Sequence, residues 1–325
     1  MELICPAGTP AALKAAVEAG ADAVYCGFRD ETNARNFPGL NFSCDELRAG
    51  IAHAHKYGVK VLVAINTFAR AGALGVWKRA VDDAVEAGAD ALIVADVGVL
   101  DYAAQRHPDQ RLHVSVQAAA ANPDAINFYV KAFGARRVVL PRVLSVAEIA
   151  AIAREVSCET EIFVFGGLCV MEEGRCSLSS YATGKSPNMD GVCSPASDVH
   201  YLKQDGQLIS RLGEFTINKF SAREPAGYPT LCKGRFQTEY GAGYLFEDPV
   251  SLDATSMLPE LQKAGVTALK IEGRQRGRAY IERVVRNFRQ TLAELEGGVP
   301  APVGGLVAFT EGQSTTVGSY RKSWR

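Results

Sequence analysis

The sequence predicts an α/β protein: a (β/α)8 barrel of the TIM-barrel type, with a cysteine-bearing insertion after the seventh strand. Three observations predict this fold. The chain has 325 residues, which suits one barrel with an insertion, and 47% of them are hydrophobic, which excludes global disorder. An amphipathic stretch, a glycine and a short apolar run recur along the chain. Eight such alternations of strand and helix fit a barrel.

The recurring unit is clearest in Glu18–Tyr25 and Glu86–Ile93, which both read Glu-Ala-Gly-Ala-Asp-Ala and then two apolar or aromatic residues. A weaker copy covers Lys263–Lys270, and looser ones cover His55–Leu62 and Ala132–Val139. Each copy predicts a helix that ends on a glycine, because glycine adopts the left-handed conformation that terminates helices. The strand that follows lacks polar alternation, as strands buried on both faces do.

The predicted elements follow one another from the N-terminus to residue 296. The strands are expected near Glu2–Cys5, Ala23–Gly27, Lys60–Asn66, Ala91–Ala95, His113–Val116, Arg137–Leu140, Glu161–Phe165 and Ala268–Ile271. The amphipathic stretches include Pro10–Ala19, Cys44–Tyr57, Trp77–Ala87, Ala125–Phe133 and Val146–Glu155. An open, doubly wound sheet is the alternative fold, because periodicity does not show whether a parallel sheet closes.

The insertion is expected over residues 166–250, since about 85 residues separate Phe165 from the next helix, expected near Leu252–Ala264. A connection of this length is functional or has structure of its own. Val199–Leu208 contains Asp205-Gly206 between apolar residues and predicts a hairpin. In a barrel the insertion leaves the C-terminal face, where active sites lie.

The barrel-like domain is therefore expected over residues 1–296, interrupted by the insertion. Residues 297–325, rich in Gly, Pro, Ser and Thr, are expected to form a loosely packed tail.

Charge and composition narrow the classes of function. The chain carries 35 basic and 36 acidic residues without a basic stripe, which argues against DNA as a partner. No signal peptide and no apolar stretch long enough for a membrane span are visible in the sequence. We therefore expect a cytoplasmic protein, in which clustered cysteines indicate metal binding rather than disulfides.

Four of the eight cysteines lie in the insertion, separated by six, sixteen and thirty-eight residues. Glycines and prolines beside them allow the backbone to turn towards one point and expose amide N–H groups to cluster sulfides. Arg175 and Lys233 would favour deprotonated thiols. The four candidate ligands are Cys169, Cys176, Cys193 and Cys232.

Two other interpretations of the four cysteines stay open. Buried structural cysteines are one, and a zinc site is the other, although the paired Cys-x2–4-Cys spacing typical of structural zinc is missing. Wide, irregular spacing fits an iron–sulfur cluster at least as well. The remaining cysteines are expected to be packing residues: Cys5, Cys26, Cys44 and Cys158.

Glu161–Cys169, followed four residues later by Gly174–Ser179, resembles the signature of the collagenase-like U-thirty-two peptidase family. Gly167 departs from it, because the family usually has Ser or Ala there. The resemblance spans nearly the whole chain and includes Cys5–Gly8, Thr32–Arg35, Ala64–Phe68, Val114–Gln117, Val139–Ser145 and Lys270–Arg276. The chain, including Thr310–Tyr320, is most similar to family members of oxygen-independent ubiquinone biosynthesis. We expect it to lack the extra C-terminal domain of the RNA-modifying members.

The resemblance implies a [4Fe–4S] cluster on Cys169, Cys176, Cys193 and Cys232. It implies hydroxylation of the aromatic ring of a ubiquinone precursor without O2, with prephenate as the suspected oxygen donor. The implied partners are a homologous UbiV-like subunit in a heterodimer and a UbiT-like lipid carrier. The alternatives are a prephenate-dependent RNA base hydroxylase and a non-catalytic, cluster-stabilised scaffold subunit. Peptidase activity is not expected, because neither a His-Glu-x-x-His nor a Gly-x-Ser-x-Gly motif is present.

Polar residues near the ends of the predicted strands complete the candidate site. Arg142 and Arg274 are expected to bind a carboxylated substrate, and Glu272 to pair with them or to transfer a proton. The alternative role for these three is an ion-pair ring that closes the barrel mouth. The possible substrate-binding residues are Asn66, Gln117, Lys270 and, in a loop over the mouth, Arg35.

Overall fold

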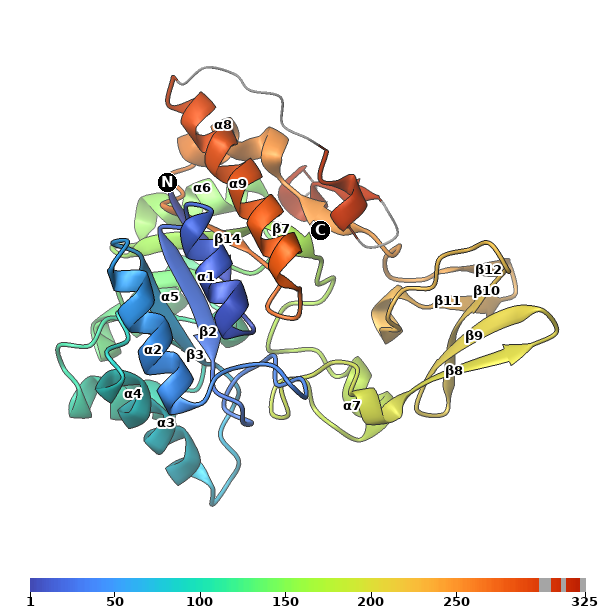
Figure 1. The fold of residues 1–325 in the computed structure, drawn as a ribbon, viewed down its shortest axis with the longest axis horizontal. Helices are drawn as coiled ribbons and strands as arrows, with labels where there is room; N and C mark the ends of the chain where they lie inside the picture. The colour runs from blue at the N-terminus through green and yellow to red at the C-terminus, as the bar shows by residue number, and fades with distance from the viewer. Residues whose placement is uncertain (298–304, 311–313, 322–325) are drawn as a thin grey trace.

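A computed structural model describes residues 1–297, 305–310 and 314–321, and its centre is a closed barrel (Figure 1). Adjacent barrel strands run parallel in chain order, and β14 pairs with both β7 and β1, which closes the ring. The predicted barrel is confirmed, and the open sheet is wrong. The barrel strands are β1 (Glu2–Pro6), β2 (Ala23–Gly27), β3 (Lys60–Ile65), β4 (Ala91–Val94), β5 (Leu112–Val114), β6 (Arg137–Val139), β7 (Glu159–Gly167) and β14 (Ala268–Ile271).

Helices surround the barrel, and local sequence explains where several begin. Ser43 and Ser145 start α2 and α6 with capping boxes, each completed by a glutamate three residues later. Among the described residues no helix is both long enough and apolar enough to span a membrane. The helices around the barrel are α1 (Pro10–Glu18), α2 (Cys44–His55), α3 (Leu74–Glu86), α4 (Val97–Arg106), α5 (Pro123–Phe133), α6 (Val146–Glu155), α8 (Leu258–Lys263) and α9 (Arg278–Leu295).

One predicted helix differs from the structure. Its first residues form strand β13 (Ser251–Asp253), which pairs antiparallel with the extended end of β7. Leu252 is buried by this pairing, so its apolar character reflects a sheet contact rather than a helix face. The helix proper, α8, starts only at Leu258.

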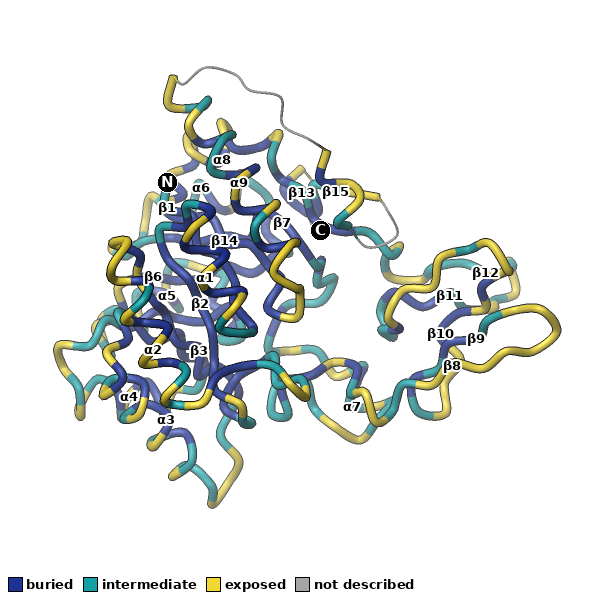
Figure 2. Tube along the Cα trace, in the orientation of Figure 1, coloured by how far each residue is buried: buried dark blue, intermediate teal, exposed yellow. Residues whose placement is uncertain are grey.

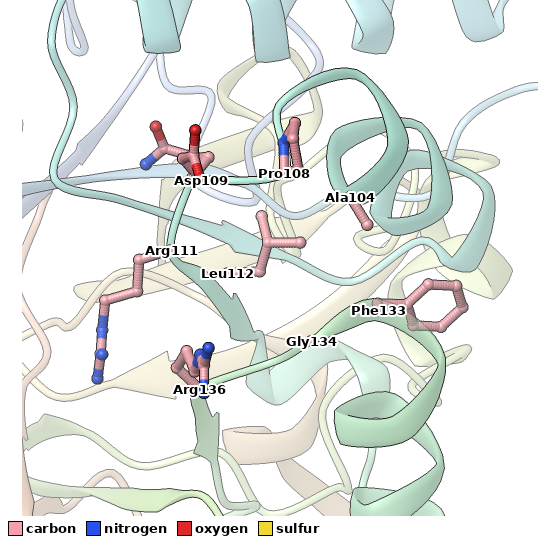
Figure 3. Close-up of a pocket in the computed structure, with 9 residues that line it drawn as sticks. Ala104, Pro108, Asp109, Arg111, Leu112, Phe133, Gly134 and Arg136 are labelled. Atoms are coloured by element: carbon pink, nitrogen blue, oxygen red, sulfur yellow. The ribbon is translucent and has the colours of Figure 1, made fainter.

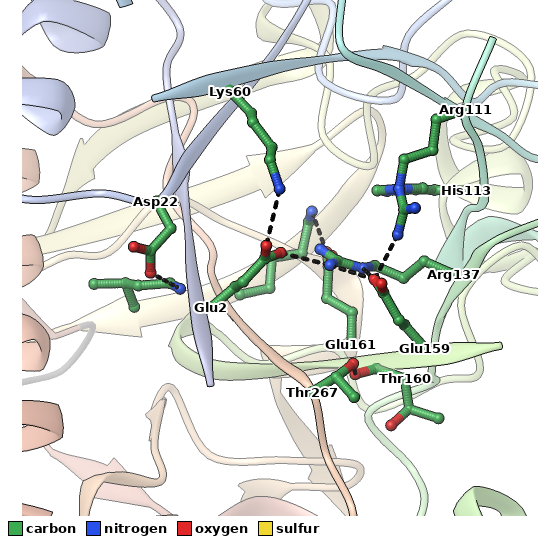
Figure 4. Close-up of polar contacts among 12 residues, drawn as sticks. Glu2, Asp22, Lys60, Arg111, His113, Arg137, Glu159, Thr160, Glu161 and Thr267 are labelled. Carbon is green, nitrogen blue, oxygen red and sulfur yellow. Dashed lines mark hydrogen bonds and ion pairs between the residues drawn. The ribbon is translucent and has the colours of Figure 1, made fainter. Parts of the chain in front are cut away.

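The interior of the barrel changes character along its axis. Alternate strand residues such as Ile4, Tyr25 and Leu62 form an inner apolar cluster, whereas their neighbours pack against the helices. The N-terminal end of the barrel contains a charged network (Figure 4). There the buried Arg137 forms ion pairs with Glu2, Glu159 and Glu161, and Lys270 Nζ lies 2.6 Å from Glu161 Oε1. The ion pairs of this network therefore close the end of the barrel opposite the insertion.

The insertion has an inner and an outer part. The inner segment, residues 168–194, contains α7 (Leu178–Thr183) and lies over the barrel. The outer lobe, residues 199–248, projects away from it and is largely exposed on its far side (Figure 2). The lobe contains β8 (Val199–Gln204), β9 (Gln207–Leu212), β10 (Phe215–Phe220), β11 (Arg235–Thr238) and β12 (Gly241–Tyr244).

The predicted hairpin is confirmed as β8 and β9. Asp205 and Gly206 both have positive φ angles, of 50° and 74°, as a two-residue hairpin turn that matches the twist of its strands requires.

The two parts of the insertion are attached differently. The inner segment bonds directly to barrel loops: the Phe68 N–H donates to the Asn188 carbonyl at 3.0 Å, and Arg70 pairs with Asp190. Several hydrogen bonds of the outer lobe join it to other parts of the insertion: Tyr228 Oη donates to the Ser194 carbonyl at 2.8 Å, and Lys233 Nζ donates to the Val250 carbonyl at 3.1 Å.

The C-terminal tail is better ordered than expected over residues 314–321. Strand β15 (Thr315–Thr316) pairs with β13. Ser319 and Tyr320 are buried, and Ser319 Oγ donates to the Leu144 carbonyl at 3.2 Å. The expectation of loose packing is wrong for this segment because it extends the sheet beside β7. The tail residues 298–304, 311–313 and 322–325 lie outside the described residues.

Candidate functional site

One cavity at the C-terminal mouth of the barrel brings the predicted site residues together. It has a volume of about 1240 Å³ and is enclosed by the strand ends, the inner segment and the outer lobe. Apolar side chains such as Phe163, Met171 and Val192 form much of its wall. Every residue of the predicted site lines it: Arg35, Asn66, Gln117, Arg142, Cys169, Cys176, Cys193, Cys232, Lys270, Glu272 and Arg274.

The four cysteines approach the cavity from two parts of the insertion. Cys169, Cys176 and Cys193 belong to the inner segment, whereas Cys232 lies on a short 3-10 turn of the outer lobe. Burial raises the pKa of Cys169 to about 12, and the charges of Glu173 and Cys232 contribute to this increase. Burial raises the pKa of Cys232 to about 11, with Cys193 and Cys176 adding to the effect. The thiols are thus close enough to disfavour one another's charged forms.

The donor set consists of four thiols, the ligands that hold a [4Fe–4S] cluster. Among the described residues no three His, Cys, Asp or Glu side chains are arranged to hold one metal ion. A tetrahedral zinc ion with bonds of about 2.3 Å would hold its sulfur ligands only about 3.8 Å apart. A [4Fe–4S] cluster is larger, because each cysteine binds a different iron, and when bound it supplies one-electron transfer. Four thiols around one wide cavity are compatible with that arrangement.

Arg142 and Glu272 hold the end of β7 rather than facing the cavity freely. Arg142 Nε lies 2.5 Å from Glu173 Oε1, and its guanidinium also donates to the Gly167 carbonyl. Glu272 Oε2 accepts the Gly167 N–H at 3.1 Å, and Glu272 Oε1 lies 3.4 Å from Arg35 Nε. Burial opposes ionisation of Glu272, but Arg35 and Arg142 hold its pKa below its usual range. Glu272 is therefore a carboxylate at neutral pH and cannot donate a proton there.

Arg274 differs from the other cationic residues of the site. Its Nη1 donates to the amide oxygen Oδ1 of Asn33 at 3.0 Å, and its guanidinium lies 5.7 Å from the centre of the Tyr25 ring. No acidic side chain in the described ranges lies within ion-pair distance of it. Burial lowers the pKa of Arg274 to about 10, so the side chain is still charged at neutral pH. A buried guanidinium without a carboxylate partner is suited to bind the carboxylate of a ligand.

The two amide side chains at the barrel mouth, Asn66 and Gln117, differ in whether their oxygen already accepts a hydrogen bond. Asn66 accepts the Ala34 N–H at 2.9 Å and donates to Ser115 Oγ at 3.1 Å. Gln117 Oε1, in contrast, is buried without a hydrogen-bond partner among the described residues. Because an unsatisfied buried acceptor costs free energy, Gln117 is the better candidate for accepting a ligand hydroxyl.

Lys270 is already occupied by the protein. Its Nζ pairs with Glu161 and lies 3.7 Å from the centre of the Tyr25 ring. Burial lowers its pKa despite the pair with Glu161. Lys270 therefore joins the floor of the cavity to the charged network of the barrel.

Sequence reasoning missed Glu173 as a site residue. Its buried carboxylate pairs with Arg142, which is 31 residues away in the chain. The sequence does show an acidic residue between the candidate ligands Cys169 and Cys176. It does not show the partner of this residue, because that partner depends on how the insertion folds back on the barrel.

A second cavity, of about 560 Å³, lies at the opposite end of the barrel, where Arg111 and Arg136 precede β5 and β6 (Figure 3). None of the predicted site residues lines it. It is therefore separate from the candidate site.

The fold and the cavity define a (β/α)8-barrel protein with a cavity at its mouth that four cysteines line. The chain belongs to peptidase family U32, which it matches over residues 8–303. The resemblance expected from the cysteine-bearing signature is thus confirmed.

Several characterised proteins are similar to the chain over most of its length. The tRNA hydroxylation protein P of Escherichia coli is 33% identical over 92% of this chain and 69% of its own length. The 23S rRNA 5-hydroxycytidine C2501 synthase of Escherichia coli is 30% identical over 90% of this chain but only 39% of its own length. A collagenase of Porphyromonas gingivalis is 28% identical over 90% of this chain and 65% of its own length. The similar proteins thus include two that are named for the hydroxylation of RNA.

Proposed function

We propose that the chain is an iron–sulfur protein of oxygen-independent hydroxylation, with a [4Fe–4S] cluster on Cys169, Cys176, Cys193 and Cys232. The observation that carries this proposal is the convergence of the four thiols and Arg274 on one cavity. The names of the tRNA and rRNA relatives support hydroxylation as the type of reaction. A cytoplasmic location is part of the proposal.

In the proposed reaction, different residues of this chain have different roles. Arg274 binds a carboxylate of the oxygen donor, for which prephenate is the candidate. Gln117 Oε1 accepts a hydrogen bond from a ligand hydroxyl and thereby orients it. The apolar wall around Phe163 and Met171 accepts a planar ring and excludes water. Arg142 and Glu272 keep the end of β7 in place.

The comparisons favour an RNA base as the substrate. Two of the relatives are named for tRNA or rRNA hydroxylation, and this chain is similar to them over at least 90% of its length. A base acted on in this cavity would have to leave its stack and enter the barrel mouth.

Features of this chain favour a second candidate, the ring of a ubiquinone precursor. The insertion 166–250, which surrounds the cavity, carries eight basic and ten acidic residues, so it lacks the positive charge that RNA phosphates attract. The apolar wall suits a prenylated ring. In this case the chain would act as a UbiU-like subunit, with a UbiV-like partner and a UbiT-like lipid carrier.

One experiment separates the two substrates. Cells that lack the gene are grown without O2, and their quinones and the modified nucleosides of their tRNA and rRNA are measured by mass spectrometry. A quinone substrate predicts unhydroxylated precursors with unchanged RNA, and an RNA substrate predicts missing hydroxynucleosides with unchanged quinones. If the gene deletion changes neither the quinones nor the modified nucleosides, and restoring the wild-type gene also changes neither, the proposed function is wrong.

A further inference from the structure

The loop that carries Cys169 is held at both of its ends by one side chain. On the N-terminal side, the Arg142 guanidinium donates to the carbonyl of Gly167, two residues before the cysteine. On the C-terminal side, Arg142 Nε lies 2.5 Å from Oε1 of Glu173, four residues after it. The Arg142 N–H also donates to Glu173 Oε2, at 3.4 Å. One guanidinium therefore bridges residues 167 and 173 across the candidate ligand.

The bridge is itself fixed by its surroundings. The Arg142 and Glu173 side chains are only 4% and 3% exposed, and the guanidinium stacks over the Phe163 ring at 4.3 Å. Ser319 Oγ donates to the Arg142 carbonyl, so the C-terminal segment holds the backbone that carries this arginine. Next to Glu173, a side chain on Gly174 would place its Cβ 1.9 Å from the Gln117 carbonyl oxygen, which shows how closely the loop approaches the barrel. Few alternative positions are open to the Cys169 backbone.

An ion pair is an unusual way to fill this space. Two apolar side chains of similar volume would often stabilise a buried site equally well. The reason is that the desolvation free energy of two buried charges offsets most of their mutual attraction. An arginine bonded to both a carboxylate and a carbonyl offers geometric precision instead, since its planar fork fixes two directions at once. Partners of this kind orient metal ligands in other proteins.

We propose that Arg142 and Glu173 are positioning residues that fix the Cys169 thiol for cluster binding; this inference rests on the proposed function. The pair acts through the backbone of residues 167–173, and both side chains also line the cavity. Glu272, which accepts the Gly167 N–H, supports the same strand end from the other side.

The test compares Glu173→Gln with a control at a more exposed ion pair, Asp22→Asn. Like Glu173, Asp22 accepts a backbone N–H (Leu3, 2.7 Å) and pairs with an arginine (Arg289, 2.6 Å), but it lies before β2 at the other end of the barrel. Full-length proteins are purified without O2, and iron loss to a chelator is followed together with the melting temperature of the iron-free forms. We expect Glu173→Gln to lose iron about 10- to 100-fold faster than wild type and Asp22→Asn to lose it at the wild-type rate. Glu173→Asp should lie between them.

The outcomes separate this inference from the proposed function. If wild type holds iron and Glu173→Gln retains it equally well, the positioning role is wrong and the proposed function stands. If wild type holds no iron–sulfur centre, the proposed function itself fails. Both variants could instead lose iron faster to the extent that their melting temperatures fall. In that case general destabilisation explains the iron loss, and the positioning role is wrong. Should Glu173→Gln not fold, Arg142→Lys, which keeps the charge but not the fork, must show the faster iron loss, and a wild-type rate overturns the inference.

Discussion

Arg274 Nη1 donates to the amide oxygen of Asn33 at 3.0 Å, so a neutral side chain holds this buried guanidinium. Arg142 and Arg35, which line the same cavity, each pair with a glutamate. The difference assigns distinct roles to residues that the sequence places in one group. The charge of Arg274 is available to a ligand, whereas Arg142 and Arg35 stabilise the protein around the cavity.

Arg274→Ala is expected to weaken the binding of prephenate. Losing one side of a buried, hydrogen-bonded charge pair costs about 2–4 kcal/mol, which raises the Kd about 30- to 1000-fold. Calorimetric titration measures the change, and Arg278→Ala, which removes an exposed arginine four residues along, should bind as wild type does. Equal affinities for the Arg274 variant and wild type would contradict the assignment.

The same variant distinguishes a catalytic from a scaffold subunit. Arg274 contacts Asn33 and Tyr25, and within the described ranges it forms no hydrogen bond with the four candidate ligands, so its loss should leave iron content and partner binding intact. If the chain carries the active site, hydroxylation in complemented cells should stop. Continued hydroxylation would favour a scaffold whose partner holds the active site.

Two adjacent glycines at the end of β7 are expected to respond differently to alanine. Gly166 has a φ of 111°, and a Cβ there would lie 2.5 Å from the Glu272 carbonyl oxygen. Strain and collision together should cost ~3 kcal/mol or more. At Gly167 a Cβ would lie 3.2 Å from Glu272 Oε2, a contact that a shift of only a few tenths of an ångström relieves, so Gly167→Ala should cost less than about 1 kcal/mol. Urea unfolding of the two variants measures both, and equal losses would refute the explanation.

Removing the cluster should loosen the outer lobe more than the inner segment. Cys232 alone of the four candidate ligands lies in the lobe, and a bound cluster would tie it to the barrel-anchored cysteines. Hydrogen exchange of the iron-free protein should therefore increase over residues 199–248 and change little over 186–191, which bond to barrel loops. Cys232→Ser should reproduce the effect, and Cys44→Ser should not. Uniform exchange in both segments would contradict this division.

The charged network at the N-terminal end predicts a loss of stability in acid. Burial opposes ionisation of Glu2, but hydrogen bonds and charge from Arg137 hold its pKa below the ordinary value of 4.5. Glu159 is also lowered, by Arg111 and Arg137. Because the unfolded chain binds these protons first, the stabilisation is present above pH 4.5 and disappears as the pH falls through the lowered values.

Arg137→Met should therefore flatten the dependence of the unfolding free energy on pH between about pH 5 and about pH 3. Arg48→Met, which removes an exposed arginine, is the control and should leave the slope unchanged. Parallel pH profiles for wild type and Arg137→Met would show that the network does not govern acid stability.

Regular elements could be predicted wherever the local sequence carries its own boundaries. The strand Ala23–Gly27 lies as predicted, because a buried apolar run ends on a glycine. Helix α4 does not follow the repeated pattern, since no glycine separates its end at Arg106 from β5. Likewise, β13 looked helical because its partner, the extension of β7, is distant in the chain.

For the candidate site, too, some features could be predicted from the sequence and others could not. Its members could be predicted from their places near strand ends, because the barrel gathers those ends at one mouth. Their partners could not, since Arg142 meets Glu173 and Lys270 meets Glu161 only once the chain has folded. The pairs decide which side chains remain available to a ligand, so roles within the site required the structure.

Four distant thiols share one iron–sulfur centre in the proposed function, and iron analysis of the purified chain is the decisive experiment. The full chain is purified without O2, and its iron, sulfide and zinc are measured beside its absorption and EPR spectra. We expect about four irons and about four sulfides per chain, with a cluster signal that disappears when Cys169, Cys176, Cys193 or Cys232 is replaced by Ser. Stoichiometric zinc without iron would contradict it.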